Sequence, residues 1–109
     1  MYIYNVTVNI DYSHEKEWLA WMQNHHIPDM LATGKFSEAK MCQVMVDADS
    51  GGVTYSVQYT TESKEMLQHY YMEDADKLRK KTLAKFGNKL VAFRTELKVV
   101  NHVQHFINS

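Results

Sequence analysis

Residues 51–60 read GGVTYSVQYT, and this stretch decides the fold. Apolar and polar side chains alternate from Val53 to Thr60, which is the pattern of a β-strand with one buried face. A turn-forming segment, residues 47–52, comes directly before this strand, and an extended apolar run spans residues 36–47. Because two extended runs around a glycine-containing turn form a hairpin, we predict paired strands at 36–47 and 53–60.

A helical pattern lies on each side of this hairpin. On the N-terminal side, four residues recur at the i, i+3, i+4 and i+7 spacing of one helix face, namely Trp18, Trp21, Met22 and His25. Pro28 is the only proline, and we expect it to break or kink this helix near Ile27. On the C-terminal side, an apolar stripe at helical spacing runs from Leu67 to Phe86 and ends at Gly87.

Strand patterns lie outside both helices, at residues 2–10 and 89–100. The order is therefore β-α-β-β-α-β. With right-handed crossovers this order gives an α+β ferredoxin-like fold, a four-stranded antiparallel sheet with two helices on one face. We expect one domain over residues 1–101. Residues 102–109 form a short polar tail that is loosely held or docks on a partner subunit.

Charge and cysteine content exclude several classes of function. The formal net charge is −1, so we expect no nucleic-acid partner, since affinity for a phosphate backbone requires clustered lysine and arginine. No apolar run has the length of a membrane span, and the first residues are strand-like rather than a leader sequence. One cysteine, Cys42, allows no internal disulfide. We therefore expect a cytoplasmic protein with neither a membrane partner nor a leader sequence.

The strand patterns also predict which face of the sheet each side chain occupies. The apolar sets, including Val57 and Phe93, are expected to lie under the helices. The polar sets, including Gln58 and Arg94, are then expected on the opposite face. That polar face either meets solvent or packs against a second copy, and we expect a homodimer. Apolar patches for such an interface would come from Ile3, Met41, Met45 and the tail.

The first helix carries the densest group of candidate functional residues, which are Trp18, Trp21, His25, His26 and Asp29. A histidine with a nearby carboxylate, in a pocket walled by aromatic rings, is suited to moving a proton. Alternatively, His25 or His26 caps the last carbonyls of the helix and packs at its end. Adjacent helical residues point about 100° apart, so the histidines do not converge on a metal ion. We predict no metal and no cofactor.

Tyrosines dominate the predicted layer between sheet and helices, among them Tyr55, Tyr59 and Tyr71. Each buried hydroxyl requires a partner or a route to solvent. The hydroxyls therefore either reach the rim of the layer, or the layer contains a cavity that binds a flat apolar ligand. Arg94 and Glu96, two residues apart, form a surface or inter-subunit ion pair, or Arg94 binds an anion.

Several motifs resemble a family of short, uncharacterised bacterial proteins over about residues 1–100. They are HIPD at residues 26–29, LATGKF at 31–36, GGVTYSVQY at 51–59, YY at 70–71 with DAD at 74–76, and VAFRTEL at 91–97. More distantly, the pattern resembles the dimeric α/β-barrel superfamily, which includes cofactor-free monooxygenases, EthD-like proteins and muconolactone isomerase. The resemblance implies a dimeric α/β barrel with a ligand cleft, and it places His26, Trp21 and Tyr55 near that cleft. Any activity it implies is monooxygenase-like or isomerase-like.

Three functions remain open on the sequence. The first is a homodimer that binds a small aromatic or polyketide-like molecule in a sheet–helix cleft, with His26 and Asp29 as catalytic candidates. The second is a non-catalytic dimeric module whose sheet–helix layer is closed. The third is an RNA-binding sheet, which would require aromatic and basic side chains on the open face. Such residues are few there, which disfavours the RNA-binding interpretation.

Overall fold

The predicted strands and helices occur in the predicted order. A computed structural model describes residues 1–45 and 51–105. The strands are β1 (Tyr2–Asp11), β2 (Glu38–Gln43), β3 (Gly52–Thr61) and β4 (Leu90–Lys98). The helices are α1 (Glu15–Trp21), α2 (Ile27–Ala32), α3 (Lys64–Glu73) and α4 (Ala75–Phe86), with short turns η1 (Tyr12–His14), η2 (Met22–His26) and η3 (Gly87–Lys89).

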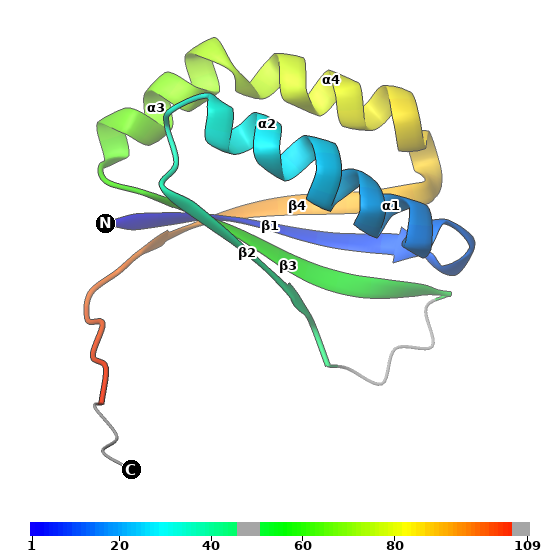
Figure 1. Cartoon of the computed structure of the whole chain (residues 1–109), viewed down its shortest axis with the longest axis horizontal. Coiled ribbons are helices and arrows are strands. Elements are labelled where there is room, and N and C mark those ends of the chain that lie inside the picture. The colour runs from blue at the N-terminus through cyan, green and yellow to red at the C-terminus, as the bar shows by residue number, and fades with distance from the viewer. Residues whose placement is uncertain (46–50, 106–109) are drawn as a thin grey trace.

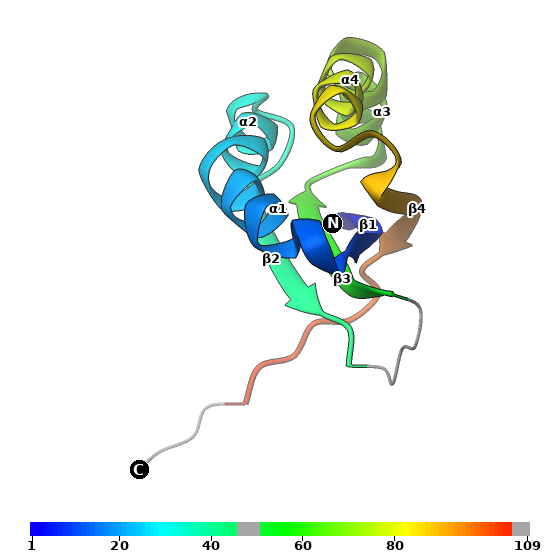
Figure 2. The ribbon, with the colours of Figure 1, turned by 90° about the vertical axis from the view of Figure 1, so that its right-hand side faces the viewer.

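The four strands form one antiparallel sheet in the order β2-β3-β1-β4. The helices all lie on one side of it, α1 and α2 in one row and α3 and α4 in the other (Figure 1; Figure 2). This arrangement confirms the predicted ferredoxin-like fold. We call the side that the helices cover the inner face and the other side the open face.

The centre of the sheet follows the predicted alternation. Val6 of β1 lies opposite Val57 of β3, and both point to the inner face. Asn5 and Thr7 point to the open face, where they lie opposite Gln58 and Ser56. The buried core consists of inner-face strand residues and the helix residues above them, chiefly Tyr4, Val8, Ile10, Trp18, Met30, Phe36, Val57, Tyr59, Leu67, Tyr70, Leu78 and Phe86.

The prediction of faces is wrong in β4. Arg94 lies opposite Val6, so it belongs to the inner face, whereas Phe93 lies opposite Thr7 on the open face and is 62% exposed. The more apolar set of the strand, which contains Val91, Phe93 and Leu97, therefore lies on the open face, contrary to what its alternation favours. Packing decides instead, because Leu90 and Ala92 contact the core beneath the helices. A shift of one residue exchanges every side chain of a strand between the two faces.

One further expectation for the open face changes with the register. Met41 lies opposite Val57 on the inner face and packs against the core, so it does not contribute to the open face. Met45 follows the end of β2 and is largely exposed. Val91 and Leu97, which lie on the same face as Phe93, give the open face an apolar border along β4.

Pro28 does distort the first helix, but the helix does not end there. The η2 segment is a π-helical turn, in which the amide of Ile27 donates to the carbonyl of Met22. Pro28 follows in the first turn of α2, directly after this π turn, so the distortion lies where the missing amide hydrogen of proline interrupts the regular helical hydrogen bonds. A π turn adds one residue to the helical repeat, and such turns are common at functional sites.

The second helical region ends at Gly87, as predicted, and has one break. The Ser63 hydroxyl accepts a hydrogen bond from the amide of Met66 at 3.1 Å and caps α3. The helix breaks at Asp74, and α4 ends at Gly87, whose positive φ of 53° suits glycine. No helix in the described ranges is both long and apolar enough to cross a membrane.

Parts of two predicted segments lie outside the described residues. They are residues 46–50 of the predicted hairpin and residues 106–109 of the C-terminal tail. The described part of the tail follows β4 without regular secondary structure and leads away from the sheet (Figure 2).

Candidate functional site

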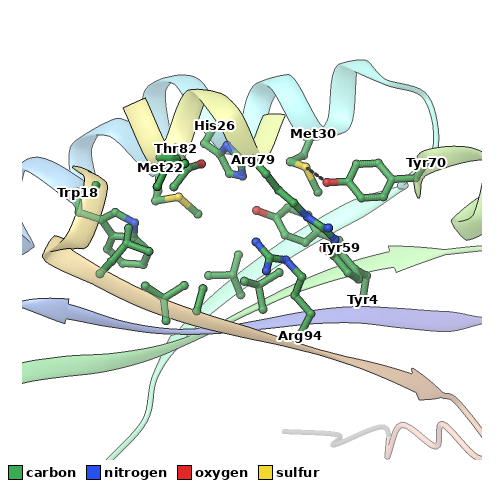
Figure 3. Close-up of a pocket in the computed structure, with 17 residues that line it drawn as sticks. Tyr4, Trp18, Met22, His26, Met30, Tyr59, Tyr70, Arg79, Thr82 and Arg94 are labelled. Carbon is green, nitrogen blue, oxygen red and sulfur yellow. Dashed lines mark hydrogen bonds between the residues drawn. The ribbon is translucent and has the colours of Figure 1, made fainter. Parts of the chain in front are cut away.

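A cavity of about 340 Å³ lies between the inner face of the sheet and the helices (Figure 3). This volume is at the lower end of the range typical of small-molecule sites. Its lining is largely apolar and aromatic, with a few polar side chains. The residues that line it are Tyr4, Val6, Val8, Trp18, Met22, His26, Met30, Val57, Tyr59, Tyr70, Arg79, Thr82, Leu83, Gly87, Leu90, Ala92 and Arg94.

The exposure of the lining residues locates the mouth of the cavity. Its exposed members lie on α4 and β4 or between them, namely Arg79, Leu83, Gly87 and Arg94. Its deepest members, such as Trp18 and Val57, are almost completely buried. The cavity therefore opens between α4 and the edge strand β4, and extends inward beneath α1 and α2.

His26 reaches the cavity from the π turn (Figure 3). Its ring stacks on Trp21, with the ring centroids 5.0 Å apart and the planes 24° from parallel. Burial lowers the pKa of His26 from 6.5 to about 4, and the charges of Arg94 and Lys81 act in the same direction. The charge of Asp29 opposes this shift but is a smaller effect. His26 is thus a neutral imidazole at neutral pH, with one nitrogen that accepts and one that donates.

Tyr59 presents the most unusual polar group of the cavity. Its side chain is 1% exposed, and its hydroxyl has no hydrogen-bond partner among the described residues. Only the Thr61 hydroxyl shares this condition in the described part of the chain, and Thr61 does not line the cavity. Burial raises the pKa of Tyr59, so the group is a neutral phenol. Buried hydroxyls almost always have a partner, so the Tyr59 hydroxyl is an exception among the described residues, and its capacity for a hydrogen bond is unused.

Both arginines of the chain line the cavity, from α4 and from β4. Arg79 donates a hydrogen bond from Nη2 to the Tyr4 hydroxyl at 2.9 Å. Figure 3 shows the guanidinium groups of Arg79 and Arg94 on the same side of the cavity as Tyr59. No aspartate or glutamate belongs to the lining among the described residues, so the charge that the cavity walls carry is positive.

The hydroxyls of two predicted ligand-binding tyrosines are occupied at the rim of the layer. The Tyr55 hydroxyl donates to the Glu15 carboxylate, and burial with this hydrogen bond raises the pKa of Tyr55 to about 12. The Tyr71 hydroxyl donates to Glu96 at 2.6 Å. Neither tyrosine lines the cavity. The two alternatives that the sequence left open for the tyrosines therefore occur side by side. The Tyr55 and Tyr71 hydroxyls reach the rim of the layer between sheet and helices, whereas Tyr59 lines a cavity within it.

Three other predicted site residues lie in a second place, an open groove on the outer side of α1, α2 and α4. They are Trp21, His25 and Asp29. The Asp29 carboxylate lies 3.6 Å from the Lys81 ammonium. The structure therefore does not bring Asp29 into the cavity with His26, and the carboxylate reaches the histidine through its electric field alone. Of the predicted site residues, Trp18, His26, Tyr59 and Arg94 come together at the cavity.

Sequence reasoning missed Arg79 and placed Arg94 on the wrong face. A signal for Arg79 exists, because it lies four residues from both Ala75 and Leu83 and therefore borders the apolar stripe of α4. Among the described residues, no three histidine, cysteine, aspartate or glutamate side chains lie close enough together to hold a metal ion. The chemistry available at the cavity is that of an apolar pocket with hydrogen-bonding and cationic groups at one side.

Crystal structures with the same fold resemble this one over almost its whole length. A dimeric ferredoxin-like protein from an uncultured marine organism has a TM-score of 0.70 and 10% identity, and the match covers 94% of this chain and 97% of that one. A second such protein has a TM-score of 0.66 and 15% identity, with 96% and 100% covered. An ethyl tert-butyl ether D (EthD) family protein from Bacillus halodurans has a TM-score of 0.60 and 17% identity, with 87% and 97% covered. At these identities, the likeness shows the fold alone.

Comparison of the sequences adds a family. Residues 1–100 match the sequence profile of a family described as a domain of unknown function (DUF4286). This match confirms the resemblance to an uncharacterised family that the sequence motifs indicated. No curated protein matches the sequence.

Proposed function

The chain belongs to this family of unknown function, DUF4286, and we propose that it is a homodimer that binds a small aromatic molecule in the cavity between sheet and helices. The observation that carries the proposal is the buried, unpartnered Tyr59 hydroxyl at a largely apolar cavity of about 340 Å³. An apolar pocket with few, well-placed polar groups is the usual form of a small-molecule site.

The alternative of a non-catalytic module with no ligand has less support. It requires a closed layer between sheet and helices, in which every tyrosine is packed without a void. The cavity and the Tyr59 hydroxyl count against it, because an empty space next to an unpartnered buried hydroxyl lowers stability without any compensating contact.

The open face supports the homodimer. Its polar side chains bond to one another across the strands: Ser56 donates to Asn5 at 2.6 Å, and Asn9 donates to Thr54 at 3.1 Å. Its border along β4 exposes Val91, Phe93 and Leu97. A face whose polar groups are already paired, next to exposed apolar side chains, loses little when a second copy covers it. Two of the similar crystal structures are described as dimeric.

His26 is the residue of this site that would exchange a proton with a bound molecule. Its imidazole is neutral and lies at the cavity, and a neutral imidazole has a free lone pair for a proton. Trp21 would act as a positioning residue, because its ring holds the imidazole from the outer side. Asp29 would adjust the basicity of His26 through its charge.

The proposal is tested by filling the cavity from one wall. Ala92 lines the cavity on β4, whereas Ala84 of α4 lines the outer groove, so Ala92→Phe and Ala84→Phe form a matched pair. We expect titration calorimetry to show that naphthoate, naphthamide or both bind the native protein and the Ala84 variant. The Ala92 variant should bind at least tenfold more weakly, because the added ring occupies the ligand volume.

Two results would contradict the proposal. The first is that neither aromatic compound binds the native protein at millimolar concentration. The second is that Ala84→Phe, and not Ala92→Phe, removes binding, which would place the ligand in the outer groove. Thermal denaturation of both variants checks that each is folded before binding is compared.

A further inference from the structure

The arginines allow the ligand to be described more closely, on the basis of the proposed function. We infer that the cavity binds an aromatic carboxylate, whose ring lies inside and whose carboxylate lies at the mouth between Arg94 and the Tyr59 hydroxyl. The inference depends on three features of the lining: the sign of its charge, the free hydrogen-bonding capacity of Arg94, and the position of the neutral polar groups.

The sign of the charge is the first feature. The chain has ten lysines and two arginines, and both arginines line the cavity. Among the described lining residues, no carboxylate offsets them. The remaining walls are mostly apolar or aromatic, so an anion with an apolar body matches the cavity better than a neutral or cationic molecule does.

The free capacity of Arg94 is the second feature. Arg94 forms no ion pair and no side-chain hydrogen bond with any residue in the described ranges. Its expected partner Glu96 instead accepts a hydrogen bond from Tyr71. All five donors of the Arg94 guanidinium are therefore available, and their planar fork matches the two oxygens of a carboxylate.

The third feature is the set of neutral polar groups that line the same cavity as Arg94. The Tyr59 hydroxyl has no partner among the described residues and lies between His26 and Arg94 in the view of Figure 3. A phenol donates to an anionic oxygen, and hydrogen bonds to charged groups are stronger than those between neutral groups. Neutral His26 can add a further N–H donor, depending on its tautomer. Arg79 keeps the donors that its hydrogen bond to Tyr4 does not use.

The mouth of the cavity accounts for the orientation of the ligand. Arg94 is exposed at the mouth, whereas Trp18, Met22 and Val57 lie deep inside. A carboxylate at the mouth keeps part of its hydration, which avoids the large cost of burying a charge completely. The aromatic ring then replaces water against the apolar walls.

The experiment compares two probes of equal shape, naphthoate and its neutral counterpart naphthamide, by titration calorimetry at physiological salt. We expect the native protein to bind naphthoate roughly tenfold more tightly than naphthamide, since Arg94 is partly screened by solvent. Arg94→Gln should reduce this preference to within about twofold. The control is Lys98→Gln, which removes the same charge from the same strand and should keep the preference, because Lys98 does not line the cavity.

Tyr59→Phe tests the second group, since it keeps the ring and removes only the hydroxyl. We expect it to weaken naphthoate more than naphthamide. If the native protein binds both probes equally, or if Arg94→Gln keeps the full preference, the carboxylate assignment is wrong while the aromatic site stands. If neither probe binds, the proposed function fails together with this inference.

Discussion

Arg94 and Phe93 are adjacent in sequence and have opposite surroundings. Arg94 lies beneath the helices at the cavity mouth, and Phe93 lies on the open face. Alternation of apolar and polar residues favours burial of the more apolar set of a strand. In β4 the more apolar set, which contains Val91, Phe93 and Leu97, lies on the open face instead, because Leu90 and Ala92 of the other set pack against the core. This orientation of β4 places the Arg94 cation at the cavity and the Phe93 ring on the opposite face.

His26 provides a prediction at the same scale. Its pKa is about 4 in the folded protein, against 6.5 for an unperturbed histidine, so it binds a proton more readily in the unfolded chain. The neutral ring therefore contributes its full share of stability above about pH 6.5, and this share is lost as the pH falls towards 4. Between pH 6.5 and pH 4, His26 should cost the native protein up to roughly 3 kcal/mol in the free energy of unfolding. We expect the His26→Gln variant not to show this loss.

Urea denaturation of native and variant protein across this pH range measures the effect. The matched control is the adjacent His25→Gln, because His25 is exposed in the outer groove and this variant keeps the buried imidazole of His26. Equal pH dependence in the native protein and the His26 variant would mean that the imidazole is solvated rather than buried.

At the scale of elements, the π turn determines which histidine reaches the cavity. Trp18, Met22, His26 and Met30 all line the cavity at intervals of four residues. In a regular α-helix, four residues advance about 40° beyond a full turn, so such a set would drift around the helix. The π turn η2 has more residues per turn, so residues four apart stay on the same face of the helix. As a result His26, and not the expected His25, faces the cavity.

The order of the elements was predictable and the π turn was not. Alternation and helical spacing are local, so they reveal strands, helices and an end such as Gly87. A single proline signals a distortion, but whether the helix stops or widens depends on the contacts made by the residues beyond it. Here Met30 is buried in the core, which holds α2 in line with α1. The same dependence on distant contacts concealed the inner position of Arg94.

The cap of α3 gives a prediction for an element. The Ser63 hydroxyl accepts from the amide of Met66, which would otherwise lack a partner in the first turn of the helix. We expect Ser63→Ala to lower the free energy of unfolding by about 1 kcal/mol and Ser63→Asp to keep it nearly unchanged, because aspartate caps equally well. Chemical denaturation of the three proteins measures this. A Ser63→Asp variant as unstable as Ser63→Ala would argue against capping.

At the scale of the whole molecule, the sheet separates two surfaces of different kinds. The inner face and the helices enclose the cavity, whereas the open face carries mutually bonded polar side chains with an apolar border. Figure 2 shows this one-sided layering, with every helix on the same side of the strands.

The proposed dimer gives a prediction for the whole molecule. Phe93 is 62% exposed at the apolar border of the open face, and Met72 of α3 is 82% exposed in the helical layer. We expect Phe93→Asp to yield a single-chain mass in light scattering at micromolar concentration, because a carboxylate buried in the interface would lack a partner. Met72→Asp should keep the mass of two chains. A native protein of single-chain mass would exclude the dimer.

The one-sided layering also affects how ligand exchange relates to assembly. If two copies meet through their open faces, the contact lies on the side of the sheet opposite the helices and the cavity, so we expect neither copy to block the other's entrance between α4 and β4. Small molecules would then enter and leave without the subunits separating. Release rates measured by stopped flow should accordingly stay constant when the protein is diluted through its association midpoint.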